Sequence, residues 1–338
     1  MARKKITRLC VASFLINVVL VIFCWRQTRW QQTQYPVSRD AKRSLSPMTS
    51  IWHPVVESSK RISYSCSKFI MYSVSVHGSY SEAHHTSGLG GAPLKKVEGF
   101  KHCSVLFLLV TQSNSNVSND KLQTYSDLGW QVLFVYHEIP AIFTRRASRA
   151  PKILPHLFFP HTDVVLYADV KLLVDLQSLD AMAVASKLLS GTQFGVVQHG
   201  WARGMEDEQN LILDAKRSRP YVVDSVETLR LQASVLHTFL SSFQKHSFAV
   251  DASLHARVLR GPANSNTFSD AWYDEYSSGC DRDQMAFYGA AARMDMQKQK
   301  EFHCNNFNRS GIYTSHSKVT FSFAIHCDFK RFGISGYP

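Results

Sequence analysis

The chain has 338 residues, of which 45% are hydrophobic, 12% aromatic and 19% charged. This composition excludes global disorder, a collagen, a coiled coil and a polytopic membrane protein, and the length suits about two domains or one large domain with attachments. The net charge of +12 is concentrated in residues 1–61, which leave 27 basic and 24 acidic residues for positions 62–338. A nucleic-acid-binding domain needs a basic stripe on its folded surface, so we expect no nucleic-acid partner.

The first apolar segment covers residues 9–25 and contains no charged residue. At a rise of ~1.5 Å per residue it spans roughly 26 Å, which suits the thinner membranes of the early secretory pathway. Basic residues cluster before it, and no small-residue cleavage site follows it. The pattern predicts a cytoplasmic tail at 1–8, a single-pass type II signal anchor at 9–25 and a lumenal body, with a cleaved signal peptide as the alternative.

Residues 26–65 are polar and interrupted by prolines, which predicts an extended stem. Two acceptor triplets, at Asn116 and Asn308, predict glycosylation in a lumenal body. Five cysteines follow the anchor, an odd number whose pairing stays open: Cys66, Cys103, Cys280, Cys304 and Cys327. Disulfides persist in the lumen, so at least some of these cysteines are expected to pair.

The body alternates apolar runs with segments of helical spacing. Strands are predicted at 69–76, 103–110, 130–136, 163–168, 194–198 and 257–260, and helices at 175–190, 206–217 and 224–244. This alternation predicts an α/β fold with a mainly parallel sheet and flanking helices. We assign this domain to residues 66–295 and treat 296–338 as a C-terminal extension.

Parallel α/β sheets bind ligands beyond the carboxyl ends of their strands, so the residues after each apolar run are candidate site residues. Those residues are His77 to Tyr80, His137-Glu138, Asp169 to Lys171, and His199-Gly200. Strand ends are also where polarity ordinarily returns, so a purely structural role is the alternative. His199 is a candidate acid or base, although a lone histidine at a strand end is more often a hydrogen-bonding residue.

Asp169 is the sharpest candidate, because it directly follows a buried strand and can hold a cation or a sugar hydroxyl there. Nucleotide-sugar transferases commonly place Asp-x-Asp at such a position, where two carboxylates hold Mg²⁺ or Mn²⁺ against a diphosphate. Here the third position is Lys171, whose charge can itself neutralise a diphosphate. The need for a divalent metal therefore stays open.

Two further segments carry candidate chemistry. A basic stretch precedes the Asp169 strand and contains Arg145, Arg146, Arg149, Lys152 and His156. Such a cluster suits an anionic ligand, or else forms a solvated face. Asp283 opens a second, amphipathic stretch and is a candidate base or hydroxyl clamp, with a helix-dipole role as the alternative. The aromatic residues at 271–276 are candidates for packing against sugar rings.

The segment from Arg149 to Val174 resembles the glycosyltransferase-like domain of the plant mucilage and turgor-regulation proteins. That family carries a K-x-x-P-H-x-x-F-P stretch that leads into an apolar strand and an Asp-x-Lys. The matching residues are Lys152, Pro155, His156, Phe159, Pro160, Asp169 and Lys171. Weaker matches are Gly78 and Tyr80 in a Gly-x-Tyr turn, the Gly129-Trp130 pair, His199 after the fourth strand, and the Arg-Asp-Gln of Arg282, Asp283 and Gln284. The likeness covers roughly residues 68–292.

The resemblance implies a GT-A-like fold and hexosyl transfer from a nucleotide sugar to a glycan or glycoconjugate, in the Golgi or endoplasmic reticulum membrane. Asp169, Asp283 and His199 are then the expected catalytic residues. The expected substrate-binding residues are Gly78, Tyr80, Lys152, His156, Lys171, Arg282 and Gln284. Lys171 stands where many nucleotide-sugar transferases have a second aspartate. One alternative is therefore an inactive relative that binds glycans or nucleotide sugars. A membrane-anchored hydrolase is the other, although the common hydrolase, P-loop and dinucleotide motifs are absent from the sequence.

Overall fold

The computed structural model describes the body of the chain in segments. These are residues 52–77, 103–110, 117–136, 141–169, 172, 180–198, 250–260, 265–278, 283–284, 286–287, 290, 309–314 and 320–326. The predicted anchor at 9–25 and most of the predicted stem therefore lie outside the described residues, as do the predicted helices at 206–217 and 224–244. In the described part, no helix is long and apolar enough to cross a membrane.

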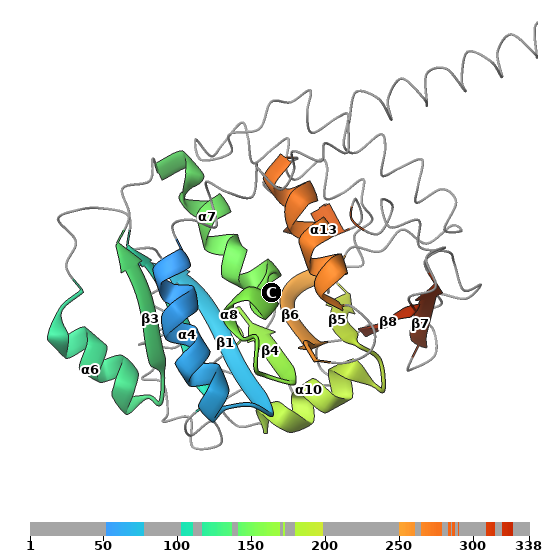
Figure 1. Ribbon diagram of the computed structural model, residues 1–338, viewed down its shortest axis with the longest axis horizontal. Helices are drawn as coiled ribbons and strands as arrows, with labels where there is room; N and C mark the ends of the chain where they lie inside the picture. The colour runs from blue at the N-terminus through green and yellow to red at the C-terminus, as the bar shows by residue number, and fades with distance from the viewer. Residues whose placement is uncertain are drawn as a thin grey trace, which may run out of the picture. The chain divides into compact units, whose positions relative to one another are not determined.

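Eight strands form one sheet in the order β3-β2-β1-β4-β6-β5-β8-β7 (Figure 1). The strands are β1 (Phe69–Val76), β2 (Ser104–Val110), β3 (Gln131–Tyr136), β4 (Val164–Ala168), β5 (Phe194–Gln198), β6 (Val250–Val258), β7 (Arg309–Thr314) and β8 (Thr320–His326). β3, β2, β1 and β4 are mutually parallel, whereas β6 runs antiparallel between β4 and β5. The predicted α/β class is confirmed, with a mixed sheet.

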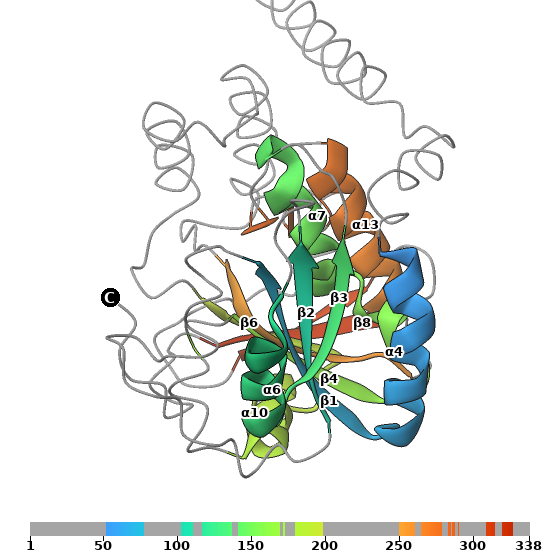
Figure 2. The same cartoon turned by 90° about the vertical axis from the view of Figure 1, so that its left-hand side faces the viewer.

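The helices cover both faces of this sheet (Figure 2). They are α4 (His53–Ser65), α6 (Asn119–Asp127), α7 (Ala141–Ile153), α8 (Pro155–Phe158), α10 (Ala181–Leu189) and α13 (Ser265–Ser278). α6 and α10 lie on one face, while α4, α7 and α13 lie on the other. The chain therefore buries the sheet on both sides, which explains why β2 is a nearly continuous apolar run and why Ser73 and Ser75 of β1 are buried as well.

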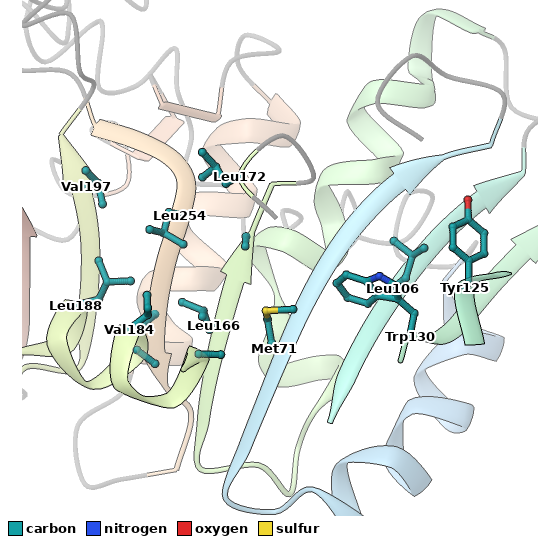
Figure 3. Close-up of a cluster of buried hydrophobic side chains, with 14 of the residues drawn as sticks. Met71, Leu106, Tyr125, Trp130, Leu166, Leu172, Val184, Leu188, Val197 and Leu254 are labelled. Carbon is teal, nitrogen blue, oxygen red and sulfur yellow. The ribbon is translucent and has the colours of Figure 1, made fainter. Parts of the chain in front are cut away.

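The face beneath α6 and α10 carries an aliphatic core that runs across the sheet from β2 to β5 (Figure 3). Met71, Leu106, Leu166 and Leu254, from four different strands, belong to this core together with Leu188 of α10. α10 approaches the sheet closely because β5 has a glycine beneath it. A Cβ at Gly195 would lie 2.9 Å from the backbone nitrogen of Leu189 and closer still to the Leu188 carbonyl. This position can hold only glycine.

The opposite face carries an aromatic core. Edge-to-face and stacked ring contacts link residues of β1, β2, β4, β5 and β6 to α8 and α13: Trp52, Tyr72, Phe107, Phe158, Phe159, Tyr167, Phe194, His255, Phe268, Trp272 and Phe287. The rings at 272, 273 and 276 are almost fully buried in this core. The hypothesis that the aromatic residues at 271–276 pack against sugar rings is therefore wrong: they pack against the protein.

Secondary structure of the body extends past both limits of the domain that was predicted at residues 66–295. Residues 53–65, assigned to the stem from their polarity, form α4, which packs on the body. Trp52, the residue before α4, attaches the helix to the body: it is fully buried and donates a hydrogen bond from Nε1 to the Ala147 carbonyl at 2.9 Å. At the other end, β7 and β8 lie in the predicted extension and join the sheet beside β5.

Candidate functional site

The order β3-β2-β1-β4 places a change of direction between β1 and β4. β1 is followed along the chain by β2 on one side, whereas β4 pairs with β1 on the other side. In open α/β sheets a ligand binds at such a point, beyond the carboxyl ends of the two strands. Those ends are His77 after β1 and Asp169 after β4. The structure thus places Asp169, the strongest candidate site residue from the sequence, at the position where open α/β sheets bind ligands.

The backbone of Asp169 is fixed on both sides. Its N–H donates to the Ser253 carbonyl of β6 at 2.7 Å, and its own carbonyl accepts from the Leu172 N–H at 2.8 Å. The side chain is partly exposed, while the preceding residue Ala168 is fully buried. Asp169 is therefore a rigidly mounted carboxylate at the rim of the sheet.

Lys152 and Asp283 form a buried ion pair beneath that rim. The Lys152 Nζ contacts the Asp283 Oδ2 directly, although 131 residues separate the two in the chain. Each side chain keeps 3% of its surface exposed. The structure therefore brings together two residues that the sequence had selected independently, one from the basic stretch and one from the Arg-Asp-Gln.

Arg149 is the third member of this cluster. It lies one turn before Lys152 on α7, and its Nε is 3.7 Å from the same Asp283 oxygen. The Arg149 side chain is 20% exposed, in contrast to the enclosed Lys152. α7 follows β3, so it begins at the carboxyl edge of the sheet and runs back across the aromatic face (Figure 1). Arg149 therefore lies nearer to the rim than Lys152.

The charges of this cluster act on one another. Burial lowers the pKa of Lys152 to about 8, against the opposing effect of Asp283. Burial alone would also lower the pKa of Arg149, but Asp283, followed by Tyr167, Tyr276 and Asp169, raises it above its ordinary value. Arg149 thus stays charged at every accessible pH, whereas Lys152 loses its proton in mildly alkaline solution. Asp169 lies within electrostatic reach of both cations.

Tyr167 forms the floor of the cluster. It is fully buried two residues before Asp169, and the Lys152 Nζ lies 5.0 Å from the centre of its ring. Burial, followed by the charge of Asp169, raises the pKa of Tyr167 well above its usual value. Its hydroxyl is buried and has no hydrogen-bond partner among the described residues. A buried hydroxyl without a partner is unusual in a folded protein, because it loses its hydrogen bonds to water without replacement.

A second buried cation supports the floor from below. Arg257 is fully buried and donates from Nη1 to the Ile153 carbonyl at 2.7 Å and to the Ser269 hydroxyl at 2.6 Å. Its guanidinium lies over the rings of both Phe194 and Trp272, and burial lowers its pKa to about 10. Its neighbour His255, whose pKa burial holds well below the ordinary value, stacks on Tyr167. These residues fix the ring of Tyr167 in place.

Of the other predicted site residues, His156 and Gln284 are described. His156 lies on α8 with its Nε2 3.1 Å from Asp270 of α13, so its described partner is outside the Asp169 cluster. Gln284 is buried beside Asp283, and its Oε1 has no hydrogen-bond partner within the described segments. The remaining predicted residues lie outside the described part of the chain: Gly78, Tyr80, Lys171, His199, Arg282, Asn116 and Asn308.

A divalent metal would find few ligands among the described residues. In these segments no group of three or more histidine, cysteine or acidic side chains is arranged to hold a metal ion. Asp283 is engaged by two cations, which leaves Asp169 as the carboxylate at the rim. One carboxylate together with phosphate oxygens of a substrate is a donor set that suits Mg²⁺. Asp169 fits a metal only in this substrate-dependent way.

Sequence reasoning did not select two of these cluster members. Arg149 appeared only as one of several bases, and Tyr167 only as a strand residue. The spacing of Arg149 and Lys152, three residues apart on a helix, is the signal that places both on one face. For Tyr167 the signal is weaker: a strand residue two positions before Asp169 points to the same side of the sheet.

Comparison with known proteins agrees with this architecture. No curated protein and no solved structure matches the chain. The model of one protein family, described as TOD1/MUCI70, glycosyltransferase-like domain, matches residues 43–320. This range includes α4, the whole Asp169 cluster and β7, and it extends beyond the predicted domain at both ends. The match confirms the family that the sequence motifs indicated: the chain belongs to the TOD1/MUCI70 glycosyltransferase-like domain family.

Proposed function

We propose that the chain is a hexosyltransferase that moves a sugar from a nucleotide-sugar donor to a glycan or glycoconjugate acceptor, on a GT-A-like fold. One observation carries the proposal: a fixed carboxylate, Asp169, stands at the rim between β1 and β4 with a cluster of buried cations beside it. A carboxylate can hold the sugar hydroxyls or a cation, and the cations can stabilise a diphosphate leaving group. Membership in a glycosyltransferase-like family supports the same reaction class.

In this reaction the bond between the sugar's anomeric carbon and the phosphate oxygen breaks, and its electron pair leaves with the nucleoside diphosphate. The acceptor hydroxyl oxygen forms the new bond to the anomeric carbon, and its proton passes to a base. Asp283 already pairs with Lys152 and Arg149, so we assign it the role of positioning those cations. Asp169 and His199 are left as the acid–base candidates.

The other contacts follow from strand ends and motif positions. Gly78 and Tyr80, next to the carboxyl end of β1, would line the nucleotide pocket, and Lys171 would lie beside Asp169. Arg282 and Gln284 flank the buried Asp283. A metal held by Asp169 would supply positive charge at the diphosphate. Every other contribution in this proposal comes from the chain's own side chains, which orient the donor and exclude water.

We also propose that the body lies in the lumen of the Golgi or endoplasmic reticulum, on a single-pass type II anchor at 9–25. The disulfide between Cys66 and Cys103 supports this proposal. It joins the end of α4 to the residue before β2. Structural disulfides are rare in reducing compartments and common in the secretory pathway.

A matched pair of variants on β4 tests the proposed function. Asp169 follows this strand at the carboxyl edge, and Asp163 precedes it at the other edge, where it is exposed. We expect Asp169→Asn to abolish release of nucleoside diphosphate from the donor while the chain stays folded. Asp163→Asn removes the same charge from the same strand and should leave turnover unchanged. An Asp169→Asn variant with normal turnover would remove Asp169 from the mechanism.

A further inference from the structure

Two buried hydrogen-bond donors in the cluster have no hydrogen-bond partner in the part of the chain that the structure describes. They are the hydroxyl of Tyr167 and the Nε of Arg149, whose separation of 3.7 Å from Asp283 is an ion pair without a hydrogen bond. The Lys152 Nζ contacts the same Asp283 oxygen that lies 3.7 Å from the Arg149 Nε, and it lies 5.0 Å from the centre of the Tyr167 ring, so the two donors belong to one neighbourhood. Leaving a buried donor unpaired is costly, and a site that does so in two places is built to receive an acceptor.

Asp283 does not provide this acceptor. Asp283 is taken up by Lys152 through a direct contact, and this contact also fixes the oxygen that faces Arg149. The Lys152 amine is held by Asp283, whereas Arg149 keeps a fifth of its side chain exposed one turn nearer to the rim. Two unpaired donors suit a ligand group that only accepts hydrogen bonds. A phosphoryl group is such a group, and arginine is the side chain that best matches its geometry.

We propose that Arg149 and Tyr167 together bind a phosphate of the ligand's diphosphate, with Asp283 and Lys152 as positioning residues for Arg149. The assignment rests on the proposed function and changes it in one respect, because the diphosphate-binding residues become Arg149 and Tyr167 instead of Lys152 and His156. When the bond from the anomeric carbon to the phosphate oxygen breaks, the electron pair stays on that oxygen. The Arg149 guanidinium and the Tyr167 hydroxyl then stabilise the new negative charge, and neither transfers a proton.

A pair of tyrosine variants separates binding from structure. Tyr167→Phe deletes only an unpaired hydroxyl, so the stability of the chain should stay the same or rise slightly. Its affinity for inorganic pyrophosphate should fall about tenfold or more, the effect of losing one hydrogen bond to a charged group. Tyr72 pairs with Tyr167 in register, but its hydroxyl donates to the Lys152 carbonyl at 2.9 Å. Tyr72→Phe should therefore lower stability and retain pyrophosphate binding.

A pair of arginine variants on α7 provides the second test. Arg149→Gln should weaken pyrophosphate binding at least about tenfold, since it removes a charged donor. Arg146→Gln removes the same charge one turn earlier on the same helix, where Arg146 donates to the Ser277 carbonyl at 3.1 Å. It should leave pyrophosphate affinity close to that of the unmodified chain. Both affinities are measured by calorimetry on the purified full chain, with unfolding curves recorded in parallel.

The outcomes distinguish this assignment from the proposed function. Pyrophosphate binding that depends on Arg149 and Tyr167 supports the phosphate site even if no nucleotide sugar is turned over. Turnover of a nucleotide sugar with unchanged pyrophosphate affinity in Tyr167→Phe and Arg149→Gln overturns the assignment and leaves the transferase standing. Failure of the unmodified chain to bind pyrophosphate up to its solubility limit overturns the assignment as well.

Discussion

At the scale of single residues, the buried ion pair of Lys152 and Asp283 should affect the stability of the fold strongly. Both side chains are 3% exposed, and each is the direct partner of the other. Removal of one member leaves the other charge enclosed with less compensation, which is much more costly than replacement of both by apolar groups. This asymmetry gives the pair a measurable signature.

We expect Lys152→Met to lower the free energy of unfolding by about 3–5 kcal/mol, the usual effect of breaking a buried ion pair. The double variant Lys152→Met with Asp283→Leu should recover part of this loss, because only Arg149, which is 20% exposed, is then left without its carboxylate partner. Chemical denaturation of the full chain measures these two variants and the single variant Asp283→Leu. A loss in the double variant equal to the sum of the losses in the two single variants would show that the pair is not coupled.

The same lysine predicts a pH dependence of stability. Its pKa is about 8 in the folded chain and 10.5 when exposed, so between these pH values the unfolded chain holds a proton that the folded chain has lost. Stability rises with pH wherever the unfolded state binds more protons, here by at most about 1.4 kcal/mol per pH unit. Below pH 8 both states are protonated and this contribution is flat.

Denaturation curves of the full chain and of Lys152→Met across this range test the assignment. The difference in unfolding free energy between the two should grow with pH above about 8, since only the chain with lysine gains stability there. If the unfolding free energies of the two chains changed with pH in parallel, the pKa of the Lys152 amine would not be lowered by burial.

At the scale of elements, the contact of α10 with β5 depends on the missing side chain of Gly195. An added Cβ would overlap backbone atoms of Leu188 and Leu189, which belong to the helix itself and cannot rotate away. The helix would have to shift away from the sheet, and the aliphatic core beneath it would open.

Gly195→Ala should therefore cost roughly 2–3 kcal/mol or more of stability, as expected for overpacking against a fixed backbone. Gly191 is a matched control on the same connection: its φ is +78°, and a Cβ there would meet open space. Gly191→Ala should cost only about 1–2 kcal/mol, from backbone strain. Thermal unfolding of both variants gives the ranking, and a Gly195→Ala variant as stable as Gly191→Ala would contradict the packing.

The strands could be predicted well, and the reason is physical. β2 is buried on both faces, so its residues from Val105 to Val110 form an uninterrupted apolar run. β6 was the exception, because Asp251, Ser253, His255 and Arg257 interrupt its apolar pattern. The structure buries all four, with Asp251 accepting from the Ser253 backbone and Arg257 held by the Ile153 carbonyl, the Ser269 hydroxyl and aromatic rings. Local composition does not reveal such compensation.

The same limit applies to α4 and to the candidate site. α4 contains Ser59 and Ser63, which are buried because their hydroxyls donate hydrogen bonds to backbone carbonyls. In the sequence these polar residues made the segment resemble a stem. In the site, Asp169 could be predicted as a rim residue because it directly follows a buried strand. Lys152 and Asp283 could be predicted because they match motif positions of the family. Their direct contact could not be inferred, because it depends on how α7 and the segment after α13 meet over the sheet. The unpaired hydroxyl of Tyr167 likewise exists only in three dimensions.

At the scale of the whole molecule, the Cys66–Cys103 disulfide closes a segment with a sequence separation of 37 residues. A loop of this size contributes about 4 kcal/mol when it is cross-linked, in the chain-entropy account. Replacement of both cysteines by serine should lower the melting temperature by several degrees, and the peptide that links residues 66 and 103 should appear in a non-reducing digest. Free thiols at both positions in protein from the secretory pathway would contradict the pairing.

We expect the whole chain to bind a nucleotide sugar at the carboxyl edge of β1 and β4. The most direct measurement is the thermal unfolding of the full chain against a panel of nucleotide sugars and free nucleotides, with and without Mn²⁺. One donor class at ~100 times its Kd should add roughly 2.7 kcal/mol of stability, and Asp169→Asn should abolish this gain. A folded chain that no nucleotide stabilises under either metal condition would contradict the claim.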